Sequence, residues 1–279
     1  MAVAVLLSAS ILAPAEASAA ARPGATNTGV PAGTALKKHS GDLTINTPGK
    51  VISGLDVYGN VTVNAKNVTI KNTRIRGTAA KVQRDLLRAS GSNTAGLIVS
   101  DVTIKPDTPT VYQRIGIRLA GPSQTVQRVN VSGTVDGIRI SSSGITVANS
   151  YLHDFKHYSW DPEHSGGSHD DAIQIEGGSS LNIVGNSISG GKNAAIQAAQ
   201  NLSALSKMQV KSNYINGGIC AVNIAKKSRP YMTGMVVSGN RFGRTLVYPK
   251  CPMTYVPTHS DLRPTSNVWD DTGKAIPLP

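Results

Sequence analysis

Side chains that could transfer protons are concentrated between His153 and Glu176. These 24 residues hold four of the six histidines and six of the sixteen acidic residues of the chain. Histidine titrates near neutral pH, and a carboxyl group can act as an acid or a base. Three aromatic side chains in the same stretch, those of Phe155, Tyr158 and Trp160, could stack on sugar rings. The segment therefore predicts acid–base chemistry on a carbohydrate, although a surface loop without such a role would also fit.

The same carboxylates could instead hold a metal ion. Their oxygen atoms suit calcium, and His164 and His169 could join them around zinc. The calcium-loop pattern D-x-[DN]-x-[DN]-G and the zinc motif H-E-x-x-H are both absent from the chain. We therefore assign no certain cofactor and keep calcium as the candidate.

Two strand-like patterns recur along the chain in step with each other. One has apolar side chains at its first, third and eighth positions. A weaker copy of it spans Val126 to Gly133, and the other copies end at Ile75, Ile104, Leu152, Ile188, Ile215 and Phe242. The second pattern is a five-residue run whose central residues are Leu87, Ile117, Ile138, Ile173, Ile196 and Val222. Short, alternating, β-branched runs bounded by Gly, Asn or Ser are typical of strands and turns.

Both series are explained by a chain that winds into coils, each carrying more than one strand. The copies lie 19 to 36 residues apart, and residues of one column would then be about 4.8 Å apart, as neighbouring strands are. We predict an all-β, single-stranded parallel β-helix, a solenoid filled by stacked apolar side chains. Steps of 35 and 36 residues predict a long loop insertion near residues 153–169.

A row of polar side chains should line the outside of this solenoid. Side chains alternate along a strand, so the residue after each central apolar residue should point outward. These residues are Arg88, Arg118, Arg139, Gln174, Gln197 and Asn223. The mostly small residues just before the central ones should point outward as well and form a smooth floor.

Three arginines in neighbouring coils repel one another. At about 5 Å the repulsion of two such charges is about 3 kcal/mol at an effective dielectric constant of 20. An anionic ligand could compensate this repulsion, because arginine grips carboxylates with two hydrogen bonds. Alternatively, Asp85 and Asp136 could neutralise the row internally, or the long side chains could spread into solvent.

The pattern from roughly Ser40 to the N-V-W-D-D-T-G run ending at Gly273 resembles the secreted, right-handed parallel β-helix proteins of the pectate-lyase-like superfamily. The resemblance implies right-handed coils. It leaves the reaction open, because that superfamily includes lyases, hydrolases, epimerases and binding proteins.

Two coils are also similar to those of polygalacturonases, which carry N-T-D-G and D-D-C-I type motifs. The matching runs here contain Asp136 and the pair Asp170 and Asp171. With Arg139 and His169 these aspartates would form a cluster of acid, base and cation in a substrate-binding groove. The G-H-G motif of that family has no match at the corresponding run 190–193, and its R-I-K motif is absent.

From these residues we expect an enzyme that acts on an acidic polysaccharide by β-elimination at a uronic acid. This reaction needs a cation at the carboxylate, a base for the C5 proton and an acid for the departing oxygen. Arg118 and Arg139 are assigned to the carboxylate, His169 or Arg139 to proton transfer, and His164 or Tyr158 to the acid. Asp170 and Asp171 would orient the cluster or hold calcium. The expected substrate-binding residues are Arg88, Arg118, Gln174, Gln197, Trp160 and Lys156.

Two other functions stay open. A polygalacturonase-like glycoside hydrolase would use Asp136, Asp170 and Asp171 as its carboxylates. A non-catalytic glycan-binding or structural β-helix would keep the fold without turnover.

The start of the chain reads as an export signal. An apolar stretch from Met1 to Ala13 is followed by small-x-small patterns, which predict a signal peptide over residues 1–21. A linker or N-terminal segment should then cover residues 22–39 and the β-helix domain residues 40–279. Export would allow a disulfide between Cys220 and Cys251.

Charge and composition narrow the choice of partners. The chain of 279 residues has 28 Lys and Arg against 16 Asp and Glu, and losing residues 1–21 would remove one acidic residue, giving 28 − 15 = +13. A basic secreted protein favours an anionic partner such as an acidic polysaccharide. We expect no nucleic acid, because the aromatic residues are not interleaved with the arginines. No later apolar run reaches the roughly 18 residues of a membrane span, so we expect no membrane partner. We also expect a monomer.

Overall fold

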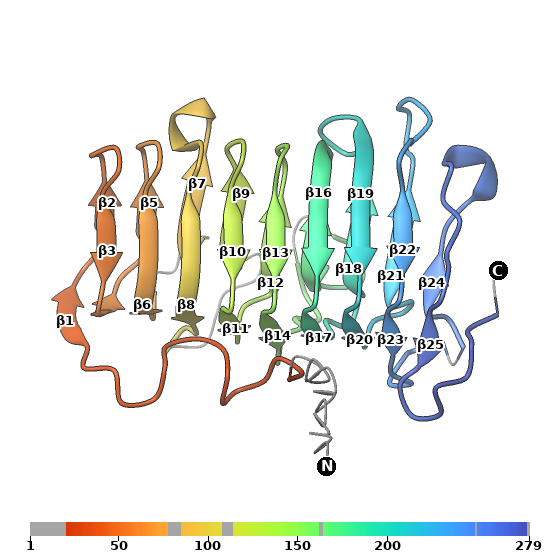
Figure 1. The fold of residues 1–279 in the computed structure, drawn as a ribbon, viewed down its shortest axis with the longest axis horizontal. Helices are drawn as coiled ribbons and strands as arrows, with labels where there is room; N and C mark the ends of the chain where they lie inside the picture. Colours follow the sequence, from red (N-terminus) through yellow and green to blue (C-terminus); the bar gives the residue numbers. More distant parts are fainter. Residues whose placement is uncertain (1–20, 78–84, 108–113, 162–163, 249, 278–279) are drawn as a thin grey trace, which may run out of the picture.

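Each coil of the chain contributes one short strand to a nine-stranded parallel sheet, the first sheet. The structure, a computed structural model, describes residues 21–77, 85–107, 114–161, 164–248 and 250–277. Figure 1 shows the coils side by side along the long axis of the molecule. The strands of the first sheet are β2 (Leu43–Ile45), β5 (Val61–Val63), β7 (Leu87–Ser90), β9 (Ile115–Ala120), β12 (Asp136–Ile140), β15 (Asp171–Ile175), β18 (Ala194–Ala199), β21 (Val222–Ala225) and β24 (Met253–Thr254).

The other described strands form a second parallel sheet that turns over a bend, so that each coil has three sides. These strands are β1 (Lys37–Ser40), β3 (Val51–Ser53), β4 (Leu55–Tyr58), β6 (Thr69–Ile75), β8 (Ile98–Ile104), β10 (Thr125–Gln127), β11 (Asn130–Ser132), β13 (Thr146–Ala148), β14 (Tyr151–His153), β16 (Gly178–Val184), β17 (Ser187–Ser189), β19 (Leu205–Lys211), β20 (Tyr214–Asn216), β22 (Val236–Ser238), β23 (Arg241–Phe242) and β25 (Val268–Trp269). Strand β8 runs through the bend and pairs with β10 before it and with β11 after it. The predicted right-handed parallel β-helix is confirmed.

The predicted interior column is also confirmed. Register along the first sheet pairs Leu87 with Ile117, Ile117 with Ile138, Ile138 with Ile173, Ile173 with Ile196 and Ile196 with Val222. All six side chains are fully buried. Burying a side chain of this size contributes roughly 1.5–3 kcal/mol, so the column is a main source of the fold's stability.

A ladder of buried asparagines fixes the bend in the C-terminal coils. The Oδ1 atom of Asn213 accepts hydrogen bonds from the backbone N–H and the Nδ2 group of Asn186, at 2.8 and 3.0 Å. Asn213 in turn donates to Oδ1 of Asn240, and Asn240 donates to Oδ1 of Asn267. The residue before Asn213, Ser212, has a positive φ of 54°, which lets the chain change direction within one residue.

Two details of the predicted pattern were wrong. The weak copy from Val126 to Gly133 has its interior residue at Val131, which pairs with Ile104 and Leu152. The expected floor of small outward residues does not exist, because Leu86, Gly116, Gly137, Ala172, Ala195 and Ala221 are buried. At Gly116 an added Cβ would lie 2.7 Å from the Val131 side chain, and at Gly137 it would lie 2.7 Å from Phe155 of the insertion, so neither position faces solvent.

The N-terminal segment runs along the second sheet rather than away from it (Figure 1). The Arg22 guanidinium stacks on Tyr214 and donates to Asp270 at 3.0 Å. Further on, Gly29 donates to the carbonyl of Arg128 at 2.8 Å, and Lys37 already belongs to strand β1. The residues predicted as a linker therefore cross several coils in contact with them. The predicted signal peptide lies, except for Ala21, outside the described residues.

No helix in the described part of the chain is long and apolar enough to cross a membrane. Its helices are the short 3-10 turns Ser92–Thr94 and Pro257–His259.

Candidate functional site

A polar cavity of about 470 Å³ lies over strands β12, β15, β18 and β21, and we call it the sheet cavity. The insertion between β14 and β15 forms one wall through Asp161, His164 and His169. The residues that line the cavity are Val135, Asp136, Arg139, Asp161, His164, His169, Asp171, Gln174, Glu176, Asn193, Gln197, Ala199, Asn201, Asn223 and Lys227. Seven of the predicted site residues therefore meet here: Asp136, Arg139, His164, His169, Asp171, Gln174 and Gln197.

Two buried carboxyl groups, those of Asp136 and Asp171, stand at the start of neighbouring strands. The Oδ1 atom of Asp136 accepts a hydrogen bond from the backbone N–H of Asp171 at 3.1 Å. Its Oδ2 atom accepts from the guanidinium of Arg139 at 2.7 Å. Asp171 has no cation as a hydrogen-bond partner in the described part of the chain, and its Oδ1 atom accepts from the Asn193 side chain at 2.7 Å.

Because their hydrogen-bond partners differ, the two carboxyl groups differ in how readily they hold a proton. Burial raises the pKa of Asp171 well above its usual range, and the negative charges of Asp136 and Asp170 raise it further. Burial also raises the pKa of Asp136, but Arg139 opposes the rise. Two carboxyls that share a buried site do not both ionise easily. The proton of the pair therefore belongs on Asp171, which suits a general acid, while Asp136 stays available as a base.

Three buried polar atoms in the wall of the sheet cavity have no hydrogen-bond partner among the described residues. They are Arg139 Nε, Asp171 Oδ2 and Gln174 Oε1. Leaving a buried polar atom unpaired costs about 1–3 kcal/mol, so these three atoms lower the stability of the cavity wall.

Two histidines of the insertion stack on each other beside this wall. The rings of His164 and His169 lie 3.9 Å apart between centroids, and Nδ1 of His164 lies 2.8 Å from Oδ2 of Asp161. Burial lowers the pKa of His169, and His164 lowers it further. His169 is therefore neutral near pH 7 and able to accept a proton.

Asp170 is fully buried beside the sheet cavity but does not line it. Its Oδ1 atom lies 2.7 Å from Nδ1 of His157, and its Oδ2 atom accepts from the backbone N–H of Lys192. Nε2 of His157 is 3.3 Å from the Lys192 ammonium. The insertion thus places a histidine against the run 190–193, where the G-H-G motif lacks a match in this chain.

The arginine row exists, and two carboxylates of the protein offset part of its charge. Register pairs Arg88 with Arg118 and Arg118 with Arg139. Asp85 accepts a hydrogen bond from Arg118 at 2.7 Å and lies 3.7 Å from Arg88, while Asp136 holds Arg139. Arg88 and Arg118 do not line the sheet cavity. The compensating anions are therefore carboxylates of the protein.

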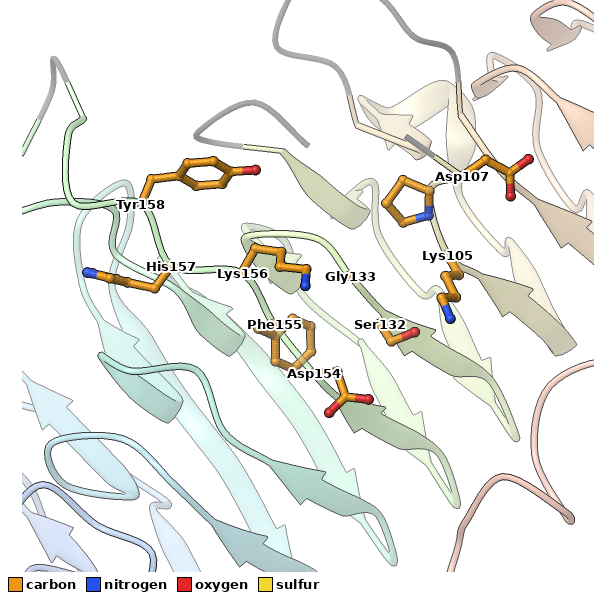
Figure 2. Close-up of a pocket in the computed structure, with 10 residues that line it drawn as sticks. Lys105, Asp107, Ser132, Gly133, Asp154, Phe155, Lys156, His157 and Tyr158 are labelled. Atoms are coloured by element: carbon orange, nitrogen blue, oxygen red, sulfur yellow. The ribbon is translucent and has the colours of Figure 1, made fainter. Parts of the chain in front are cut away.

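Three other predicted residues also lie elsewhere. Lys156 and Tyr158 line a second cavity of about 790 Å³, the loop cavity, between the insertion and the turns that follow β8 and β11 (Figure 2). Trp160 is 65 % exposed and lines neither cavity. Cys220 and Cys251, whose Cα atoms are 4.8 Å apart, form a disulfide. The described residues contain no group of three His, Cys, Asp or Glu side chains arranged to hold a metal ion.

Sequence reasoning missed several residues of the cavity wall. Asn193 and Lys227 were not considered, and Asp161 and Glu176 were considered only as metal ligands. The sequence could have indicated Asn193, because this residue directly precedes strand β18 just as Asp170 directly precedes strand β15 one coil earlier. The insertion has no period, so the contact of His157 with Asp170 has no counterpart in the sequence pattern.

Comparison with known proteins supports the fold and leaves the reaction open. No curated protein and no solved structure shows significant similarity to the chain. Residues 86–251 match the family model described as a right handed beta helix region. This match covers more than half of the chain, from β7 through the coil closed by Cys251, and the chain belongs to the right-handed β-helix family.

Proposed function

We propose that this protein is a secreted glycoside hydrolase that cleaves an acidic polysaccharide in the sheet cavity. The observation that carries the proposal is the pair of buried carboxyls in the wall of one polar cavity, of which Asp136 accepts a hydrogen bond from Arg139 and Asp171 has a pKa raised by burial and by the charge of Asp136. Hydrolysis of a glycosidic bond uses two carboxyl groups, one protonated and one ionised.

The proposed roles follow from the hydrogen bonds. Asp171 gives its proton to the glycosidic oxygen as the bond to the sugar carbon breaks. Asp136 takes a proton from the attacking water, whose oxygen forms the new bond to that carbon. A carboxylate offers about four lone-pair sites, so Asp136 can accept this proton beside its bonds to Arg139 and Asp171.

β-Elimination is the second candidate, and neutral His169 favours it. This histidine could remove the C5 proton of a uronic acid while Arg139 faces its carboxylate. Hydrolysis is preferred because Asp136 already occupies Arg139, and Asp85 occupies Arg88 and Arg118.

Product analysis on a panel of polysaccharides tests the proposal. The purified protein should release reducing ends from at least one acidic polysaccharide without products that absorb in the near ultraviolet. Asp171→Asn should abolish the release. Asp271→Asn, which changes an exposed carboxylate paired with Arg244, is the matched control and should leave it unchanged.

The other outcomes are equally specific. Unsaturated products that absorb in the near ultraviolet would replace the hydrolase with a lyase. Tight retention of a glycan without turnover by wild type or variant would leave only a binding function.

A further inference from the structure

We propose that residues 22–34, the N-terminal strap, dock on the second sheet and hold the last coil of the solenoid closed against local unfolding. This role is independent of any reaction in the sheet cavity. In a solenoid each coil contacts its neighbours, so a terminal coil can open while the others stay folded. Figure 1 shows the strap, in red, running from β1 along the row of coils.

The last coil of the second sheet is held by few bonds of its own. Strand β25 has two residues and pairs with β23 over two residue pairs. On its other edge the tail of the chain folds back, and the backbone N–H of Trp269 donates to the carbonyl of Lys274 at 2.9 Å. The last strand of the first sheet, β24, is equally short but directly follows the disulfide Cys220–Cys251. The chain has two cysteines, so no second disulfide can fasten β25 in the same way.

The start of the strap reaches this coil through Arg22. Its Nη1 atom donates to Oδ2 of Asp270 at 3.0 Å, and Oδ1 of the same carboxylate accepts from Arg241 at 2.8 Å. The Arg22 guanidinium also lies 4.3 Å from the ring centroid of Tyr214, and its Nε atom donates to Oγ of Ser187 at 3.4 Å. A single exposed ion pair contributes little to stability, but these contacts join the coils of β17, β20, β23 and β25 in one network.

The second anchor of the strap is Gly29, over the coils of β8 and β11. Its backbone N–H donates to the carbonyl of Arg128 at 2.8 Å, and the next N–H, that of Val30, donates to Oγ1 of Thr103 at 3.0 Å. Gly29 is buried with a φ of 77°, and an added Cβ would lie 2.5 Å from Thr103 Oγ1 and 2.9 Å from Cβ of Asn130. Both the backbone conformation and the close approach require glycine here, so the strap fits one position on the sheet.

Between the two anchors the strap is held in a turn by its own hydrogen bonds. The Oδ1 atom of Asn27 accepts from the backbone N–H of Gly24 at 2.7 Å, and its Nδ2 group donates to the carbonyl of Arg22 at 3.1 Å. The Thr28 hydroxyl donates to the carbonyl of Gly24 at 2.6 Å. Such local bonds fix the path of the backbone, so docking at Gly29 keeps Arg22 at a high effective concentration beside the last coil. Loss of the Gly29 anchor should therefore loosen a coil that Gly29 does not touch.

Hydrogen exchange of the full chain, measured at single amides by NMR, tests this long-range effect. The reporters in the last coil are the backbone N–H groups of Val268 and Asp270, and the remote reporter is that of Ser141; all three donate to the preceding coil. Gly29→Ala is compared with Gly33→Ala. Gly33 has the same φ of 77°, but an added Cβ there would meet nothing within 4 Å, so this control carries the backbone strain without the clash.

We expect Gly29→Ala to speed the exchange of Val268 and Asp270 about tenfold, and Gly33→Ala by less than about twofold, with Ser141 unchanged in both. Arg22→Gln should speed the same two amides. Combined with Gly29→Ala it should add little, because both substitutions release the same contact and coupled sites are not additive.

Four results would contradict this role of the strap. They are faster exchange in Gly29→Ala that stays within the strap and the coils of Thr103 and Asn130, an equal effect of Gly33→Ala, full additivity with Arg22→Gln, and equal acceleration at Ser141. The last result would show general destabilisation rather than the opening of one coil. None of these measurements involves turnover, so the strap and the proposed function can fail separately.

Discussion

The backbone N–H of Asp171 donates to Oδ1 of Asp136 at 3.1 Å, and this bond couples two carboxyls of unequal surroundings. Asp136 has a second donor in Arg139, whereas the Oδ2 atom of Asp171 has no hydrogen-bond partner among the described residues. The register of β12 and β15 creates this relationship, because it brings the starts of both strands to the same edge of the cavity.

Replacing Asp171 by asparagine should remove activity and stabilise the fold. Loss of a general acid lowers kcat by a factor of about 10²–10⁴. The folded-state pKa of Asp171 is raised, so its contribution to stability is present below its unfolded-state pKa and is lost as pH rises through the folded-state value. At pH 8 the uncharged asparagine avoids this loss, and we expect the free energy of unfolding to rise by about 1 kcal/mol.

Urea unfolding at pH 5 and pH 8, together with the turnover assay, checks both parts. The stabilisation should be smaller at pH 5. Asp136→Asn is the contrasting variant, because it leaves Arg139 without its carboxylate, and it should lose activity and about 2 kcal/mol of stability. Equal stability changes in the two variants would contradict the assigned protonation states.

Asn193 sets the alkaline limit of the reaction in this scheme. Its side chain donates to Asp171, which lowers the pKa of that carboxyl against the effect of burial. Asn193→Ala should therefore shift the alkaline limb of kcat/KM to higher pH. Asn201→Ala, at another position of the cavity wall, is the control. A profile that moves to lower pH, or that moves equally in the control, would show that Asp171 is not the acid.

The sequence pattern predicted the coils well because the interior imposes one strict requirement. Every coil must place a β-branched or similar side chain in the column of Ile117 and Ile138, and this requirement recurs in register. Where polar residues interrupt the pattern the prediction failed, and the coil with Val131 at its interior position was assigned two residues too late.

The site was harder to predict than the fold. Register brought Asp136, Arg139 and Asp171 together, as expected from their places in the repeat. The path of the insertion follows contacts between single side chains, such as His157 with Asp170, and no period reveals these. Tyr158 and Lys156, expected as acid and substrate-binding residue, therefore line the loop cavity and not the sheet cavity.

The buried asparagines of the ladder should contribute more to the free energy of unfolding than exposed asparagines do. Asn213→Ala removes the acceptor of the backbone N–H of Asn186, one of the two acceptors of its Nδ2 group, and the side-chain donor to the carbonyl of Ile183. Buried unpaired groups cost about 1–3 kcal/mol each, so we expect a loss of about 3–5 kcal/mol in the free energy of unfolding. Denaturant unfolding measures it. Asn64→Ala, which removes an exposed bond to Asn46, should cost less than about 0.5 kcal/mol.

Asp85 is the carboxylate that two arginines of the row, Arg88 and Arg118, share. Its side chain is largely buried and faces Arg118 at 2.7 Å and Arg88 at 3.7 Å. Asp85→Asn keeps the shape but leaves the two guanidinium groups repelling each other across neighbouring strands. We expect a loss of about 1–3 kcal/mol in the free energy of unfolding at low salt. The two arginines, of which Arg88 is the more exposed, would then bind sulfate, so added sulfate should restore more stability to the variant than to the wild type.

Unfolding in urea at low salt, with sodium sulfate and with sodium chloride at equal ionic strength, separates ion binding from screening. The control is Asp271→Asn, whose exposed pair with Arg244 should contribute less than about 1 kcal/mol in any of these solutions. If Asp85→Asn is as stable as the wild type at low salt, the row needs no internal anion. The arginines would then be free to bind a uronate, and β-elimination would be better supported than hydrolysis.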